Sequence, residues 1–225
     1  MASEIKAILF DIDNTLIDFF KMKEKSCEAA VEMMISNGLK MKKEDGMREI
    51  YSIYEKRSME YRDVFEKIIK KANGKLDYRI LASGVLAYRK AKEEYLIPYP
   101  GVTSVLTKLK KKYKLAVVSD APSMKAWMRL ISMKIDGFFD IIITKGDVKR
   151  QKNSPIPFNS ALKQLNIKPE EAMMVGDRIE RDIHMAKKLG LKTCFARYGV
   201  AKPPAPGKSG ADFEIEDVRE LNKFL

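Results

Sequence analysis

The sequence predicts an α/β fold, a doubly wound parallel sheet with an α-helical cap domain inserted after the first strand. Short, nearly continuous apolar runs alternate with amphipathic helical stretches along most of the chain. Acidic or hydroxyl residues directly follow several of these runs. A long segment after the first run has helical periodicity and no strand pattern. Apolar runs without polar alternation are typical of parallel strands that helices cover on both faces.

The predicted strands begin at residues 5–10, where a turn signal ends an apolar run. Further strands are predicted at residues 115–118, 141–143, 172–175, 193–195 and 213–215. Two of the helices between them follow the i, i+3, i+4, i+7 spacing, at Val102, Val105, Leu106 and Leu109, and at Phe158, Ala161, Leu162 and Leu165. Alternation of strand and helix in this order predicts a parallel sheet.

The inserted segment is expected at residues 17–97, with residues 1–16 and 98–225 forming the α/β core. It contains three helical stripes: Cys27, Ala30, Val31, Met34 and Ile35; then Met47, Ile50, Tyr51 and Tyr54, with a continuation through Tyr61, Val64, Phe65 and Ile68; then Ile80, Leu81, Gly84, Val85 and Tyr88. Residues 98–101, Pro-Tyr-Pro-Gly, mark the return to the core. The three stripes therefore predict a helical bundle.

The chain carries 43 basic and 31 acidic residues, a net charge of +12. Such a charge attracts nucleic acid or anionic metabolites, and it also arises from solvated lysine-rich helix ends. Lysine runs at residues 40–43 and 108–112 have no interleaved aromatic residues for base stacking, so no nucleic-acid partner is expected. With no stretch of eighteen apolar residues and no leader, we expect a cytoplasmic protein without a membrane partner. The sequence does not indicate an oligomeric state.

Polar residues gather where the predicted strands end. Asp11 and Asp13 follow the first strand, Ser119 and Asp120 the second, and Asp177 the fourth. Ligands of open parallel sheets bind beyond the carboxyl ends of the strands. Side chains at i and i+2 of a strand point to one side, so Asp11 and Asp13 are expected to be close enough to require a cation between them or a proton on one of them.

These residues form four motifs in order: Asp11-Ile12-Asp13-Asn14-Thr15, Val118-Ser119-Asp120, Lys152, and Gly176-Asp177 with Asp182. Together they resemble the motifs of the haloacid dehalogenase superfamily, whose core is Rossmann-like and whose capped members carry an inserted helical domain. Within it the likeness is nearest to archaeal glyceraldehyde-3-phosphate phosphatases, on residues 174–179 and 197–199. The family's lysine usually precedes a proline, whereas Asn153 follows Lys152, so Lys149 is an alternative.

The resemblance implies the role of each residue. Asp11 is the nucleophile, Asp13 the general acid and base, and Ser119, Asp120 and Lys152 bind the substrate phosphate. Mg²⁺ is the implied cofactor, with Asp11, Asp177 and the backbone carbonyl of Asp13 as ligands, supported by Asp182. The implied substrate is a small phosphorylated metabolite.

The chemistry of phosphate transfer requires groups of the kinds that these residues provide. Attack on a phosphate ester needs a nucleophile, charge neutralisation on the phosphoryl oxygens and a proton for the leaving oxygen. A 2-haloacid dehalogenase on the same fold is the first alternative, but a halide leaves without a proton, and such enzymes lack an acid at the position of Asp13. A catalytically inactive member that binds anions or nucleic acid is the second alternative.

Overall fold

The computed structural model describes residues 4–225 and divides the chain into two compact units. One comprises the described residues up to Asp18 together with Ile97–Leu225, and the other is Phe19–Leu96. The bounds that the sequence predicts for the inserted unit are residues 17–97. Within residues 4–225, no helix has the length and apolar character needed to cross a membrane.

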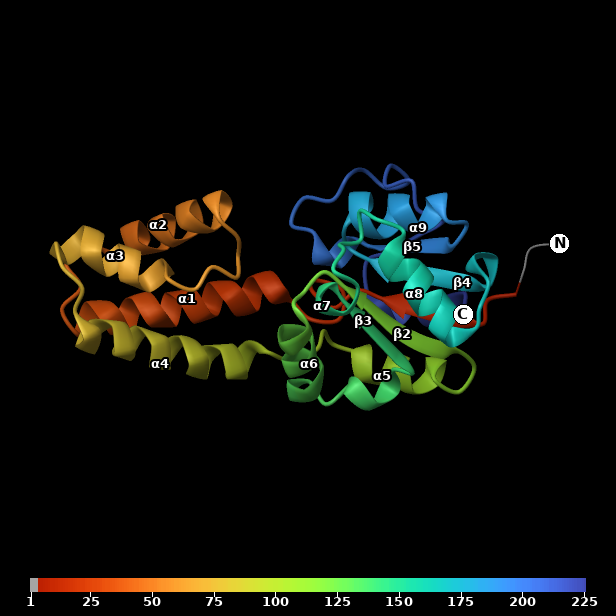
Figure 1. Ribbon diagram of the computed structural model, residues 1–225, viewed down its shortest axis with the longest axis horizontal. Coiled ribbons are helices and arrows are strands. Elements are labelled where there is room, and N and C mark those ends of the chain that lie inside the picture. The colour runs from red at the N-terminus through yellow and green to blue at the C-terminus, as the bar shows by residue number, and fades with distance from the viewer. Residues whose placement is uncertain (1–3) are drawn as a thin grey trace. The chain divides into compact units, whose positions relative to one another are not determined.

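The core unit contains the predicted parallel sheet. Its strands in the described residues are β1 (Ala7–Phe10), β2 (Lys114–Ser119), β3 (Ile141–Thr144), β4 (Ala172–Gly176), β5 (Lys192–Ala196) and β6 (Phe213–Ile215). They lie in the order β3-β2-β1-β4-β5-β6, and every neighbouring pair is parallel (Figure 1). The predicted α/β fold is confirmed.

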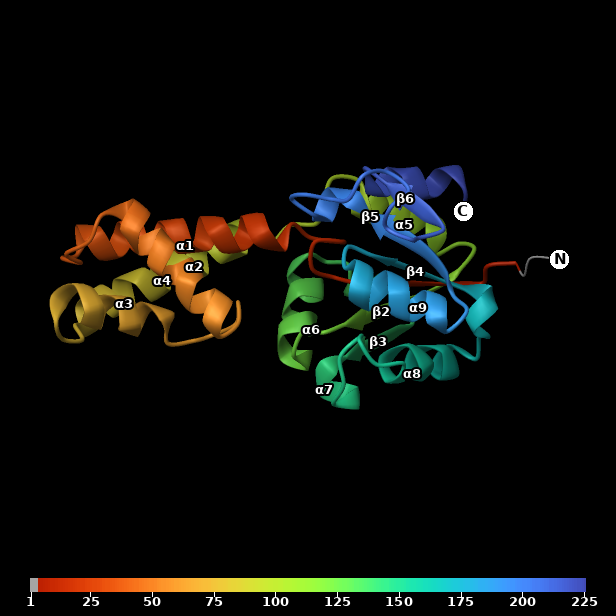
Figure 2. The ribbon, with the colours of Figure 1, turned by 90° about the horizontal axis from the view of Figure 1, so that it is seen from above.

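Helices cover the sheet on both faces, as a doubly wound fold requires. The core helices are α5 (Val102–Leu109), α6 (Ser123–Ser132), α7 (Lys145–Val148), α8 (Ile156–Leu165) and α9 (His184–Lys188). Shorter helical turns are η1 (Asp136–Phe138), η2 (Pro169–Glu171), η3 (Ile179–Ile183), η4 (Arg197–Gly199) and η5 (Val218–Lys223). Figure 2 shows α8 and α9 on one face of the sheet and α5 on the other. The face under α8 is filled by Leu9, Val118, Phe158, Leu162 and Met174.

The register of the central strands places the predicted site residues at one edge of the sheet. Phe10 lies opposite Val117 of β2 and Val175 of β4. β1 ends at Phe10, whereas β4 continues to Gly176 and β2 to Ser119, so the carboxyl ends of these central strands lie at one edge of the sheet. β1 itself has no exposed surface along its four residues, which explains its uninterrupted apolar sequence.

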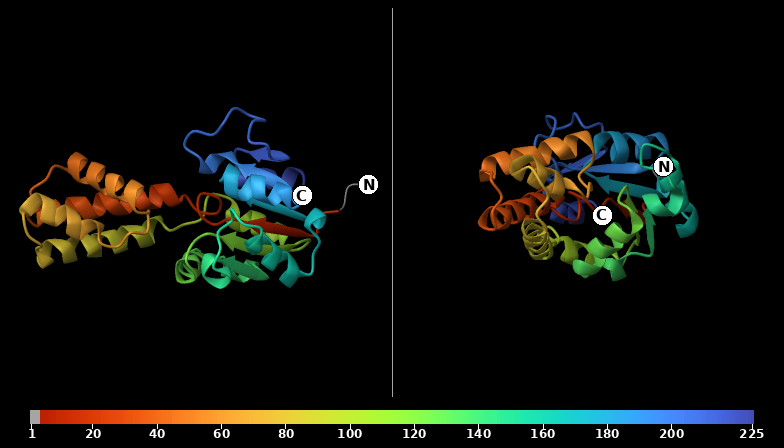
Figure 3. Two further views of the ribbon diagram at one scale, coloured as in Figure 1. Left: turned by 45° about the horizontal axis from the view of Figure 1, so that its top comes forward. Right: turned by 60° about the vertical axis from the view of Figure 1, so that its left-hand side comes forward.

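The inserted unit is a bundle of α1 (Phe19–Ser36), α2 (Lys43–Lys56), α3 (Val64–Asn73) and α4 (Tyr78–Tyr95). Helices α1 and α4 run side by side (Figure 1 and Figure 3). Gly84 permits this close approach, because a Cβ atom there would lie 2.5 Å from Met34 Cγ. Asp77 begins α4 by accepting hydrogen bonds from the backbone N–H groups of Arg79 and Ile80.

The second apolar stripe does not form one helix, contrary to the expected continuation. Helix α2 ends at Lys56 and α3 begins at Val64. The stripe position between Tyr54 and Tyr61 is the polar Ser58, so the apolar face is interrupted there. Because the helix is interrupted here, α3 contacts both α2 and α4. These contacts bury the apolar residues of α3.

Candidate active site

The loop after β1 positions the first two aspartates. The backbone N–H of Asp11 still donates to Val175 O of β4, at 3.0 Å. Beyond it the chain turns tightly: Asn14 is in the left-handed region, with φ of 59°, and Leu16 donates to Ile12 O at 2.9 Å. β1 ends at Phe10, so Asp11 and Asp13 both lie beyond its last residue, where strand alternation alone does not set their relative direction.

Lys152 lies against the predicted nucleophile. Its Nζ is 2.7 Å from Asp11 Oδ1 and 2.6 Å from Asp182 Oδ1, and the residue is 1% exposed. Burial by itself would lower the pKa of Lys152, but the charges of Asp11 and Asp182 outweigh it and raise that pKa above its usual value. Of the two lysines left open by the sequence, Lys149 is exposed, and Lys152 is the one that contacts Asp11.

Three buried carboxylates form a cluster around this lysine. Oxygens of Asp11, Asp177 and Asp182 lie within 4.8 Å of one another. Burial, with repulsion from Asp11, raises the pKa of Asp177 to about 8. Burial also raises the pKa of Asp182 to about 6, although Lys152 opposes that rise. Among the described residues, the buried Asp177 Oδ1 has no hydrogen-bond partner. Hard oxygen donors with excess negative charge and an unsatisfied oxygen fit a hard cation such as Mg²⁺.

Asp182 reaches the cluster through an unusual turn. Residues Ile179–Ile183 form a turn of π-helix (η3), in which Ile183 N–H donates to Arg178 O. A π turn is wider than an α turn and is common at functional sites. Asp182 is completely buried there, and its Oδ2 accepts a hydrogen bond from Arg178 N–H at 2.9 Å. The bulky residues Glu180 and Arg181, directly before Asp182, do not keep its carboxylate from this cluster.

Gly176 provides the space for Asp182, and Gly176→Ala is expected to disrupt the site. A Cβ atom at Gly176 would lie 2.3 Å from Asp182 Oδ2 and 2.4 Å from its Cγ. Asp182 is held by Lys152 and Arg178, so its displacement breaks these contacts. We expect a loss of about 1–3 kcal/mol in the free energy of unfolding, measured in urea, with weaker Mg²⁺ binding.

Gly137→Ala is the matched control for this prediction. A Cβ atom at Gly137 meets nothing within 4 Å, so the same added methyl group should leave Mg²⁺ binding unchanged. Equal Mg²⁺ binding by the Gly176→Ala variant and the wild type would show that the close packing of Gly176 and Asp182 is not required.

Ser119 and Asp120 follow β2 at the same edge. Ser119 is buried, and its Oγ accepts a hydrogen bond from Ala121 N–H at 3.2 Å. Asp120 Oδ1 accepts from the backbone N–H of Lys152 at 2.8 Å, and its Oδ2 is 2.9 Å from Arg181 Nη1. The Asp120 carboxylate thus ties the Lys152 loop to η3.

Asp13 contacts a different cation from Asp11. Its Oδ2 is 2.9 Å from Nη1 of Arg129, a buried residue of α6. The carboxylate of Asp13 is not part of the Asp11, Asp177 and Asp182 cluster. Each of the two carboxylates thus has its own cationic neighbour, Lys152 for Asp11 and Arg129 for Asp13.

The profile of the family described as haloacid dehalogenase-like hydrolase matches residues 8–196 of this chain. This match covers most of the chain and all four predicted motifs. The chain belongs to the haloacid dehalogenase-like hydrolase family. The resemblance expected from the motifs is confirmed.

Named relatives within this family are similar over nearly the full length. A glyceraldehyde 3-phosphate phosphatase of Pyrococcus furiosus is 32% identical, over 98% of this chain and 93% of the relative. A phosphoglycolate phosphatase of Aquifex aeolicus is also 32% identical, over 98% of this chain and 96% of the relative. The crystal structure of a haloacid dehalogenase-like phosphatase from Thermococcus onnurineus, 25% identical, superposes with a TM-score of 0.69 and covers 97% of each chain.

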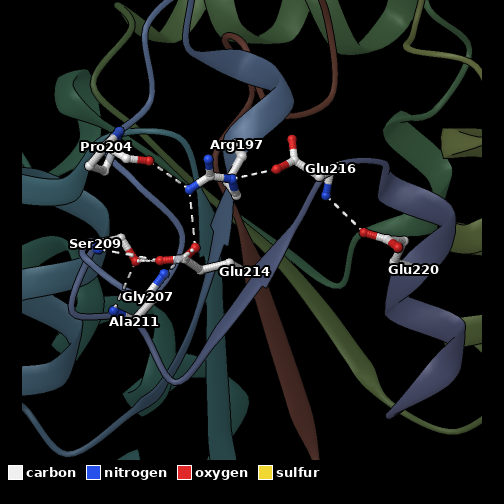
Figure 4. Close-up of polar contacts among 8 residues, drawn as sticks. All are labelled: Arg197, Pro204, Gly207, Ser209, Ala211, Glu214, Glu216 and Glu220. Carbon is white, nitrogen blue, oxygen red and sulfur yellow. Dashed lines mark hydrogen bonds and ion pairs between the residues drawn. The ribbon is translucent and has the colours of Figure 1, made fainter.

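In this haloacid dehalogenase-like hydrolase, η4 supports the loop after β1, which carries Asp11 and Asp13. Tyr198 donates a hydrogen bond from its hydroxyl to Thr15 O at 2.8 Å. Gly199 packs so closely that a Cβ atom there would lie 1.9 Å from Asn14 O. Figure 4 shows how Arg197 anchors η4, through Glu214 and Glu216 at β6 and the carbonyl of Pro204.

Sequence reasoning missed two parts of this site. The first is Arg129, for which a signal existed: a charged residue lies on the buried face of a helix, beside Ala126 and Leu130. Such a residue is almost never fully buried unless it is paired. The second is the supporting role of η4, whose residues contributed only to the family likeness and gave no sign of a contact with the loop after β1.

Proposed function

We propose that the protein is a Mg²⁺-dependent phosphatase that hydrolyses a small phosphomonoester through an aspartyl-phosphate on Asp11. The observation that carries this proposal is the contact of Asp11 with Lys152 inside a buried cluster of three carboxylates. A nucleophile and a fixed cation stand together at the edge of the sheet where ligands of this fold bind. The phosphatases among the family relatives support the same reaction.

The chain's own residues perform the bond changes. An Asp11 oxygen attacks phosphorus, and the bond from phosphorus to the ester oxygen breaks as Asp13 gives that oxygen a proton. Water then attacks the aspartyl-phosphate, Asp13 takes a proton from the water, and inorganic phosphate leaves with Asp11 restored. A covalent intermediate divides one difficult hydrolysis into two easier steps. Acid–base assistance by a residue such as Asp13 contributes roughly 10²–10⁴-fold.

Charge on the transferred group is balanced by fixed donors. Lys152 offsets the negative charge of the phosphoryl oxygens, and the Ser119 hydroxyl donates to one of them. Asp120 keeps Lys152 in place through its hydrogen bond to the Lys152 backbone. Mg²⁺ held by Asp11, Asp177 and the backbone carbonyl of Asp13, with Asp182 beside it, would supply further charge neutralisation.

We infer that the substrate is a small phosphorylated metabolite, with glyceraldehyde 3-phosphate as the first candidate. Relatives that act on glyceraldehyde 3-phosphate and on phosphoglycolate, two small phosphomonoesters, favour this class. A screen of phosphorylated metabolites with Mg²⁺, scored by released phosphate, tests it. The screen includes a 2-haloacid scored by released halide, and halide release without phosphate release would favour a dehalogenase instead.

Removal of divalent metal is expected to stop turnover. With EDTA, three buried carboxylates remain against Lys152, and substrate phosphate adds more negative charge. We expect phosphate release to fall to background and to return when Mg²⁺ is added in excess of the chelator. Mg²⁺ should also raise the melting temperature, because it binds the folded state.

Hydrolysis that continues at an undiminished rate in EDTA would contradict the proposed site. Tight RNA or DNA binding at physiological salt, without phosphatase activity under Mg²⁺, would favour the inactive binding member instead.

A further inference from the structure

The contact between Arg129 and Asp13 joins a buried cation to the predicted acid and base. Arg129 Nη1 lies 2.9 Å from Asp13 Oδ2, and the two side chains are 4% and 27% exposed. Replacing either residue by a neutral one removes this attraction between an enclosed guanidinium and a carboxylate. The Asp13 side chain is partly exposed, although its Oδ1 atom is buried, and the arginine is enclosed in the core unit.

Helix α6 fixes the position of this arginine. Ala126 and Leu130 lie on the same face of the helix and are completely buried. This packing leaves Arg129 little freedom to follow Asp13 if the carboxylate turns away. Arginine is also suited to such a place, because its planar guanidinium is always charged and binds a carboxylate in a fixed direction.

The backbone of Asp13 is fixed independently of its side chain. Asp13 forms an isolated bridge with Ile17, and Asn14 N–H donates to Ile17 O at 2.7 Å. The turn therefore sets where the Cα of Asp13 lies, whereas the direction of the carboxylate depends on what it contacts. One such contact is with Arg129, on a helix more than a hundred residues later in the chain.

We propose that Arg129 is a positioning residue that holds the carboxylate of Asp13 in the direction from which it exchanges a proton with the leaving oxygen. This inference rests on the proposed phosphatase function. It assigns separate cations to separate tasks: Lys152 accompanies the nucleophile Asp11, and Arg129 orients the acid and base Asp13.

The inference makes a specific prediction about leaving groups. An alkoxide leaves poorly without a proton, whereas p-nitrophenolate leaves readily without one. A misdirected Asp13 should therefore impair hydrolysis of an alkyl phosphate more than that of p-nitrophenyl phosphate. For Arg129→Met we expect kcat/KM to fall about 10²-fold with the alkyl ester, within the range of acid–base assistance, and less than about tenfold with the aryl ester.

The experiment compares Arg129→Met, Arg129→Lys, Asp13→Asn and the double variant Asp13→Asn with Arg129→Met. Each is assayed with Mg²⁺ on glycerol phosphate and on p-nitrophenyl phosphate. Arg48→Met serves as the control, because it removes an arginine from an exposed pair with Asp45 at 3.0 Å in the inserted unit. Circular dichroism and thermal melting report folding, and Arg129→Lys keeps the charge if Arg129→Met is too unstable.

The expected result is selective loss with the alkyl ester, partial rescue in Arg129→Lys, and little further loss when Arg129→Met is added to Asp13→Asn. Non-additivity of this kind identifies residues that act through one another. Equal losses of kcat/KM on both esters, or fully additive effects of the two substitutions in the double variant, would overturn the inference. The contact of Arg129 with Asp13 would then serve only the stability of the fold. A wild type that hydrolyses neither ester under Mg²⁺ would instead overturn the proposed function.

Discussion

Asp11→Asn is expected to abolish phosphate release while leaving the fold intact. The amide of asparagine is a poor nucleophile, so no aspartyl-phosphate forms, and losses on the order of 10⁶-fold follow when an enzyme's nucleophile is removed. Lys152 keeps Asp182 as a partner at 2.6 Å, so the buried ammonium stays compensated. Loss of the Asp11 charge also relieves the repulsion that contributes to the raised pKa of Asp177.

Three measurements test this expectation. Phosphate release from p-nitrophenyl phosphate reports turnover, acid quenching with ³²P-labelled substrate reports the covalent intermediate, and urea unfolding reports stability. Asp45→Asn is the control, because it makes the same change at an exposed aspartate of the inserted unit. An Asp11→Asn variant with a near-normal rate, or one that still accumulates labelled enzyme, would rule out Asp11 as the nucleophile.

Lys152→Met is expected to damage both stability and turnover. The lysine is completely enclosed and contacts Asp11 and Asp182, so methionine leaves a cluster of buried carboxylates without this charge. Removing one partner of a buried ion pair costs about 3–5 kcal/mol in the free energy of unfolding. Turnover should fall by about 10²–10³-fold, the usual effect of removing one fixed donor to a developing charge.

Added Mg²⁺ should recover part of the stability lost in Lys152→Met, because a cation bound by the same carboxylates restores positive charge. Lys149→Met is the matched control: the exposed Lys149 is three residues earlier in the chain and was the other candidate from the sequence. Urea unfolding with and without Mg²⁺ gives the comparison. If Lys149→Met were the inactivating change, or if Lys152→Met unfolded at the wild-type urea concentration, the assigned role of Lys152 would be wrong.

Most of the fold could be predicted from local sequence. A strand occurs at each of the six predicted places, and Asp11, Ser119 and Asp177 all lie at strand ends. The reason is that an apolar run without alternation reports burial on both faces, which is a property of neighbouring residues in the chain. The break between α2 and α3 was not predicted, because it depends on how these helices pack against α1 and α4.

The sequence by itself determined the parallel sheet, the inserted bundle and the acids at the edge of the sheet. Only the tertiary structure decided which cation each acid contacts: Lys152 for Asp11, and Arg129 for Asp13. It also decided that Asp182 joins the cluster, through a π turn that Gly176 leaves room for. Spacing fixes the direction of a side chain while a strand continues, but beyond its last residue that direction depends on turn geometry and on partners distant in the chain.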